Sequence, residues 1–116
     1  MATNFRISVH KNAEYLDLKL MGNFDGTSAH ELLHALANCG VDTSRIYIDT
    51  SYLKEIYRFG LQVFHDNLYL LKGKELDLVF AGEYACELAP EEPIPLYLTV
   101  STATNPGLET PSITAD

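Results

Sequence analysis

The sequence predicts an α/β domain in which a strand pair precedes two strand–helix–strand units, in the order β-β-α-β-α-β. Apolar and polar residues alternate strictly over residues 5–10 and again over residues 15–20, which is typical of half-buried strands. Apolar stripes with helical spacing then occupy residues 28–38 and 58–72, and each stripe precedes a short apolar segment rich in strand formers. Two successive strand–helix–strand units favour one layered domain with a parallel sheet.

The first two strands are expected to form a hairpin. Only residues 11–14 separate the last alternating position of one strand from the extended run of the next. A link this short joins neighbouring strands running in opposite directions, and Asn12 tolerates the backbone of a tight turn. The strand pair is therefore predicted to be antiparallel.

The first helix has recognisable start and stop residues. Ser28 and Glu31 fit a capping box, in which the serine caps the helix and the glutamate reaches back. Gly40 follows the apolar stripe and would supply the left-handed stop. The second helix, residues 58–72, would end in the same way at Gly73.

Two apolar runs supply the remaining central strands. Residues 46–48 form a short inner strand that ends at Asp49, Thr50 and Ser51, and residues 76–80 form the fourth strand. Beyond residue 80, residues 83–88 could form a short helix and residues 94–100 an added edge strand. We therefore expect a domain over residues 1–100 and a polar tail over residues 101–116.

Length, composition and charge limit the classes of function that the chain can have. The 116 residues suit one domain, and a net charge of −8 comes from 8 Lys+Arg against 16 Asp+Glu. All the basic residues precede residue 75, so the C-terminal third accounts for the whole net charge. An acidic surface repels phosphate backbones and anionic headgroups, which argues against nucleic acid and membrane surfaces as partners. A basic partner surface remains an option beside plain solubility.

Cysteine use and the N-terminus favour a cytoplasmic protein. Cys39 and Cys86 form neither a C-x-x-C pair nor a zinc spacing, and both are expected to be reduced and buried. No basic segment followed by an apolar stretch marks a signal peptide at the start of the sequence. No apolar run approaches the ~20 residues of a membrane span.

The order of these motifs resembles the STAS domain, the fold of bacterial anti-sigma factor antagonists. Residues 18–25, LKLMGNFD, resemble the second strand of that family and its exit, "G-x-hydrophobic-D". Residues 45–51, RIYIDTS, resemble the central strand that ends in "D-x-S", and Ile56, Gly60 and Leu61 fit the later "I-D-S-S-G-L" segment. The resemblance covers residues 5–82 and implies a four- or five-stranded mixed sheet with the helices packed on one face.

The sequence departs from the family where the family is usually phosphorylated. The positions of Asp-Ser-Ser read Tyr57, Arg58 and Phe59, so no hydroxyl stands at the usual acceptor position. A phosphate there would add roughly −1.5 to −2 charges, and Phe59 cannot carry one. We favour burial of Phe59 against the first helical turn; if it is exposed, it offers a fixed hydrophobic contact instead. Phosphorylation of Thr50 or Ser51 stays open.

The remaining groups of polar residues do not indicate a catalytic site. His30 and His34 are four residues apart on the first helix and could hold a metal, but they lie off its apolar stripe and no third ligand is evident. No nucleophile elbow, Walker A loop or G-x-G-x-x-G is present. We expect no catalytic residues, no metal and no cofactor.

The resemblance implies a non-enzymatic protein-interaction module, a regulatory adaptor without the usual phosphorylation switch. Its partner would be an anti-sigma factor-like kinase or another regulatory protein, and a homodimer is a further option. The alternatives are a small-ligand or nucleotide-binding module at the same strand ends, or a STAS-like subunit of a bacterial lipid-transport ABC complex. The predicted partner-binding residues are Asp25, Asp49, Thr50, Ser51, Tyr57, Arg58, Phe59 and Gly60.

Overall fold

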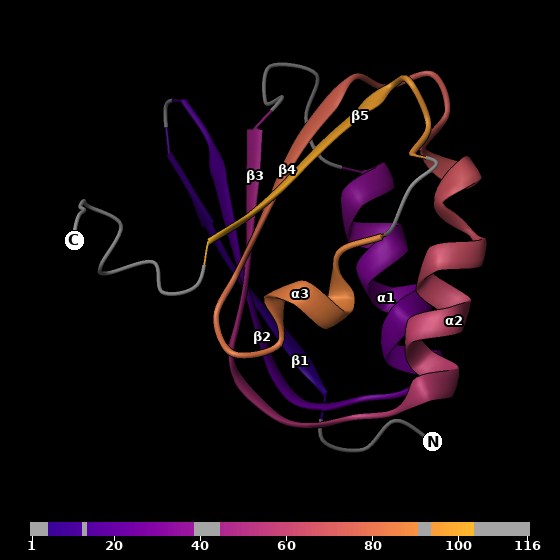
Figure 1. Ribbon diagram of the computed structural model, residues 1–116. Helices are drawn as coiled ribbons and strands as arrows, with labels where there is room; N and C mark the ends of the chain where they lie inside the picture. The colour runs from indigo at the N-terminus through magenta and orange to yellow at the C-terminus, as the bar shows by residue number, and fades with distance from the viewer. Residues whose placement is uncertain (1–4, 13, 39–44, 91–93, 104–116) are drawn as a thin grey trace, which may run out of the picture.

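The computed structural model describes residues 5–12, 14–38, 45–90 and 94–103. One five-stranded sheet, in the spatial order β1-β2-β3-β4-β5, carries the fold (Figure 1). Strand β1 runs antiparallel to β2, and the four strands from β2 to β5 are parallel. The elements in chain order are β1 (Arg6–Lys11), β2 (Leu16–Phe24), α1 (Gly26–Ala37), β3 (Arg45–Ile56), α2 (Arg58–Asp66), η1 (Leu68–Leu71), β4 (Leu76–Ala81), α3 (Ala85–Leu88) and β5 (Leu98–Ala103).

Alternating burial along the strands defines an inner face and an open face of the sheet. Every second residue of β2 from Leu16 to Phe24 is buried, and the intervening ones are half-buried. The parallel register places Leu18 beside Ile48, so the apolar residues of neighbouring strands share the inner face. The predicted hairpin is confirmed, with Ile7 opposite Leu20 across the antiparallel pair.

The helices lie together on the inner face, with α1 and α2 side by side (Figure 1). Three fully buried rings, Phe24, Phe64 and Phe80, pack edge to face between this layer and the sheet. The predicted α/β class, with a mixed sheet and helices packed on one face, is confirmed. None of the helices in the part of the chain that the structure describes could span a membrane.

The start of α1 corrects the predicted cap. The N-cap is Asp25, whose carboxylate accepts the backbone N–H of Ser28 at 2.9 Å, so the helix begins at Gly26. Ser28 is fully buried, with its hydroxyl within hydrogen-bond distance of the backbone oxygen of Asn23. An aspartate three residues earlier thus takes the role expected of Ser28, and Glu31 stays exposed. The predicted stop at Gly40 lies outside the described residues.

The second helix is shorter than predicted. Helix α2 ends at Asp66, where the side chain of Asn67 donates to the backbone oxygen of Val63 at 2.8 Å. The chain continues as the 3₁₀ turn η1, which keeps Leu68 and Leu71 buried. The predicted apolar stripe is therefore present, but capping by Asn67 divides it between the α-helix α2 and the 3₁₀ turn η1.

Strand lengths also differ from the prediction. Strand β3 runs on to Ile56 instead of ending at residues 49–51, and two shifts in its pairing with β2 set nine residues of β2 against the eleven from Ile46 to Ile56. Register shifts of this kind are not revealed by the apolar pattern. Strand β5 begins at Leu98 and ends at Ala103, three residues beyond the expected domain boundary at residue 100. The rest of the predicted tail lies outside the described residues.

Candidate functional site

Two strand–helix junctions lie together at one end of the sheet. Phe24 and Ile56, the last residues of β2 and β3, are register partners, and α1 and α2 begin directly after them. The backbone N–H of Tyr57 donates to the backbone oxygen of Phe24 at 2.9 Å. Residues far apart in sequence, Asp25 and those that begin α2, therefore form one surface, which we call the junction surface: Asp25, Gly26, Tyr57, Arg58, Phe59 and Gly60.

Gly60 fixes the approach of α2 to the other junction. A Cβ atom built on Gly60 would lie 2.8 Å from the backbone oxygen of Phe24 and 2.9 Å from that of Asp25. Those atoms are backbone and cannot move aside cheaply, so the contact needs a residue without a side chain. The glycine predicted from the sequence for partner binding is thus buried, and its role in the structure is to allow this close packing.

Phe59 is exposed, which contradicts the burial that we favoured from the sequence. Its relative exposure is 68%, and one edge of its ring lies against Gly26 of α1. Because Gly60 takes the inward position of the first turn, the preceding residue points outward. A shallow hollow of about 390 Å³ lies beside the ring, lined by Asp25, Gly26, Thr27, His30, Phe59 and Val63.

Asp25 is a half-buried carboxylate held in place by α1. Donation from the backbone N–H of Ser28 lowers the pKa of Asp25 below its ordinary value, and the Ser28 hydroxyl acts in the same direction. The helix N-terminus favours the charged form as well. Asp25 therefore presents a fixed negative charge at the edge of the junction surface.

Tyr57 and Arg58 supply the polar part of the junction surface. The phenol of Tyr57 donates to Oε1 of Glu55 at 2.7 Å, and this contact with a carboxylate raises the pKa of Tyr57. Tyr57 is 44% exposed and makes no side-chain cap to α2, while Arg58 is exposed on the first turn. Aromatic and basic side chains thus flank Phe59.

Asp49, Thr50 and Ser51 do not join this surface, contrary to the prediction. They lie within β3, and the six residues from Ser51 to Ile56 span roughly 16 Å of extended chain. Asp49 lies on the open face and accepts the backbone N–H of Ser51 at 2.9 Å. Thr50 is fully buried; its hydroxyl donates to the backbone oxygen of Ala81 at 2.8 Å and accepts the N–H of Tyr84 at 3.0 Å.

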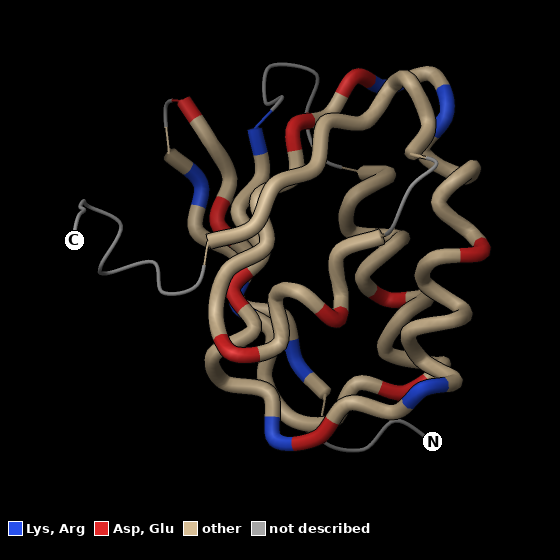
Figure 2. The backbone as a smooth tube through the Cα atoms, viewed as in Figure 1, with Lys and Arg blue, Asp and Glu red and all other residues tan. Residues whose placement is uncertain are grey.

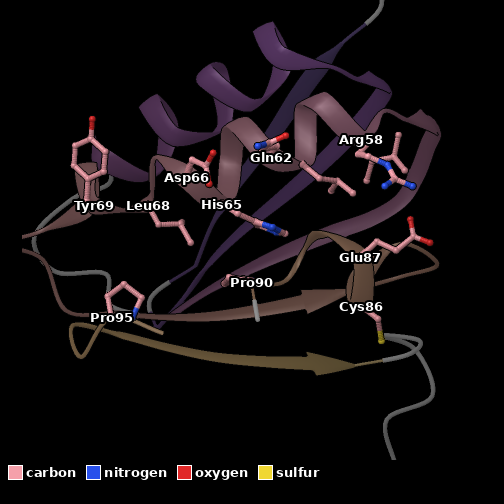
Figure 3. A pocket seen from close by; sticks show the side chains of 12 residues that line it. Arg58, Gln62, His65, Asp66, Leu68, Tyr69, Cys86, Glu87, Pro90 and Pro95 are labelled. Atoms are coloured by element: carbon pink, nitrogen blue, oxygen red, sulfur yellow. The ribbon is translucent and has the colours of Figure 1, made fainter. Parts of the chain in front are cut away.

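A larger groove, which the sequence did not predict, runs between α2 and α3. Its volume is about 950 Å³, and Arg58 at one end connects it to the junction surface. Figure 3 shows His65 pointing from α2 toward the opposite wall, where α3 carries Cys86 and Glu87. A nitrogen of His65 lies 2.8 Å from the backbone oxygen of Leu88, so this side chain links the two walls.

The α3 side of the groove is acidic and carries an exposed cysteine. From Glu75 onward, the described chain carries only acidic charges, which Figure 2 shows along β4 and α3. Cys86 is exposed rather than buried as expected, and Cys39 lies outside the described residues. His30 and His34 are both exposed, and no group of three metal-binding side chains occurs among the residues that the structure describes.

The sheet order and the single helical layer agree with the mixed α/β arrangement that the resemblance to the STAS domain implied. No protein-family profile matches the chain, and no curated protein matches it. It is similar to the anti-sigma factor antagonist SpoIIAA in its unphosphorylated form, at 12% identity over 86% of this chain and 89% of that one, with a TM-score of 0.49. It is also similar to an uncharacterized DUF3478-family protein with a SpoIIAA-like fold from Shewanella loihica, at 22% identity over 72% and 73%, with a TM-score of 0.45.

Proposed function

We propose that the chain is a non-enzymatic regulatory adaptor that binds another protein through the junction surface. The observation that carries this proposal is Phe59, a 68% exposed aromatic side chain on the first turn of a helix. Aromatic residues and arginine are enriched where proteins bind one another, and Tyr57 and Arg58 flank this ring. The fixed carboxylate of Asp25 would add orientation and selectivity.

The same surface supports a constitutive contact rather than a phosphorylation switch. In the STAS pattern, a hydroxyl at position 59 would gain charge on phosphorylation and repel an acidic partner. Phe59 keeps its apolar character under all conditions, so binding would be controlled by the amounts of the two proteins. We place this function in the cytoplasm, with an anti-sigma factor-like kinase or another regulatory protein as the partner.

Affinity capture with three forms of the full chain tests the proposal. The forms are the wild type, Phe59→Asp, and Leu96→Asp as a control, since Leu96 is a fully exposed apolar residue outside the junction surface. We expect the wild type and the control to retain the same partner and Phe59→Asp to lose it. All three should melt within a few degrees, because surface substitutions seldom change stability by more than ~0.5 kcal/mol.

Two results would overturn parts of this proposal. Equal capture by Phe59→Asp would remove the junction surface from the contact, and a large fall in its melting temperature would make Phe59 a packing residue. Treatment with a Ser/Thr kinase of the STAS-partner type should leave the chain unlabelled. Phosphate on Ser51 would show that a switch exists at another position.

A small-ligand module is the second candidate, favoured by the groove between α2 and α3. Arg58 and His65 could meet an anionic group there, while Leu61 and Leu68 offer apolar contact. Thermal shift with ATP and GTP separates the two candidates, since a ligand that binds the folded state raises the melting temperature. Capture of a transporter ATPase instead of a kinase would favour the lipid-transport alternative.

A further inference from the structure

The open face of the sheet carries a small hollow between β2, β3 and β4. Asp17 and Tyr47 are register partners there, as are Asp49 and Ala81, and they alternate with inner-face residues such as Leu18 and Ile48. The hollow has a volume of about 230 Å³ and is lined by Tyr15, Asp17, Tyr47, Asp49 and Ala81. It lies on the opposite side of the sheet from α1 and α2, so it is separate from the groove in Figure 3.

Two tyrosine rings form the aromatic part of this hollow. The ring centroids of Tyr15 and Tyr47 are 5.0 Å apart, with planes inclined at 72°. This edge-to-face arrangement turns one π face away from the ring-to-ring contact, and a π face attracts cations. Ala81 is small, so no bulky side chain from β4 occupies the space beside Asp49.

Within the part of the chain that the structure describes, the two carboxylates of the hollow form no ion pair. The side chain of Asp17 has no hydrogen bond or ion pair within the described ranges, and the side chain of Asp49 accepts only the backbone N–H of Ser51 there. Three basic side chains border the hollow on this face: Lys19 is the register partner of Asp49, His10 is that of Asp17, and Arg45 interacts with the phenol of Tyr47. Among the described residues, none of them forms an ion pair with Asp17 or Asp49. Nε of Arg45 lies 3.0 Å from Asp77, and the ammonium of Lys19 lies 5.6 Å from the centroid of the Tyr52 ring.

We propose that this hollow binds an organic cation, an alkylammonium or guanidinium group. Two carboxylates attract positive charge, and the tyrosine faces favour a polarisable organic cation over a strongly hydrated ion. A hard metal ion requires six or more oxygen ligands, which this set cannot supply. The cation could belong to a free small molecule or to a Lys or Arg side chain of another protein, and the inference is independent of the junction surface.

Titration of isotope-labelled protein with choline, followed by amide NMR, tests the proposal. We expect shifts centred on Tyr15, Asp17, Tyr47 and Asp49, with a Kd of about 1–10 mM at low salt. The neutral isostere 3,3-dimethyl-1-butanol should bind at least fivefold more weakly, because it lacks the charge. A parallel titration with N-acetyl-arginine amide shows whether the site prefers a free ammonium ligand or a protein side chain.

Matched variants separate the hollow from general charge attraction. Asp17→Asn should weaken choline binding about three- to tenfold without unfolding, since the carboxylate of Asp17 makes no hydrogen bond or ion pair in the described structure. Asp66→Asn on α2 changes the net charge equally and should leave binding unchanged, whereas Lys19→Gln should strengthen it. Tyr15→Leu should weaken it about threefold or more through loss of a ring. Equal binding of the neutral isostere, equal effects of Asp17→Asn and Asp66→Asn, or no shifts on this face would each overturn the proposal.

Discussion

Replacing Thr50 by valine should strongly destabilise the chain, although valine has nearly the same shape. The hydroxyl donates to the backbone oxygen of Ala81 and accepts the N–H of Tyr84, so it joins β3 to the turn that follows β4. Valine leaves both groups without this partner. Each unsatisfied buried group costs about 1–3 kcal/mol. Because Tyr84 is half-buried and water can reach part of that turn, we expect a total loss of ~2–4 kcal/mol in the free energy of unfolding.

Thermal and urea denaturation followed by circular dichroism measure this loss. At about 4 °C for each kcal/mol in a domain of this size, the melting temperature should fall by ~8–16 °C. Thr50→Ser keeps the hydroxyl and loses one methyl, so it should cost only ~1 kcal/mol. Ser51→Ala should change the free energy of unfolding by no more than ~0.5 kcal/mol, because Ser51 is exposed. A Thr50→Val protein as stable as wild type, or one no worse than Thr50→Ser, would refute the reasoning.

Three further predictions concern the junctions and one turn. Gly60→Ala should cost about 1–3 kcal/mol in the free energy of unfolding, because its Cβ would meet backbone oxygens at 2.8–2.9 Å; urea unfolding measures this. Asp25→Ala should cost ~1 kcal/mol at pH 7. Because folding lowers the pKa of Asp25, the difference in free energy of unfolding between wild type and Asp25→Ala persists above about pH 4. It disappears as acid protonates Asp25 in the wild type. Asp25→Asn keeps a cap that does not depend on pH. Gly82→Ala should destabilise far more than Gly73→Ala in thermal melts: both have a φ of +98°, but only Gly82 faces atoms within 3 Å.

The sequence was informative wherever a periodic pattern met a single buried face. Alternation at Leu16, Leu18 and Leu20 predicted β2 and its inner face, and the helical stripes predicted the layer that covers it. Such patterns reflect burial directly, because one face of each element must leave water. They carry no information on bulges, so β3 was predicted to end where it changes register. Because of this error, Asp49 and Ser51 were assigned to a loop at the strand end and predicted to bind a partner.

The candidate site was only partly accessible from sequence. Asp25 and Gly60 were named correctly as neighbours of the α2 start, but capping and close packing explain their positions without any partner. The hollow at Tyr15 and Asp17 could not be predicted, because it depends on which residues of three strands are register partners. Non-local register is decided by turns and bulges, which a single sequence specifies weakly.

Helix geometry displays the side chain at position 59 on the surface. Gly60 must face the β2–α1 junction because only a glycine fits there, and Phe64, one turn later, is fully buried on the same side. The residue before Gly60 is rotated by about 100° away from that face and meets solvent, together with Val63 one turn on. Whatever side chain stands at position 59 is therefore displayed on a fixed surface. A hydroxyl there could accept a phosphate, whereas the apolar character of Phe59 is permanent. Under the proposed adaptor function, we therefore expect partner affinity to depend on the ring itself.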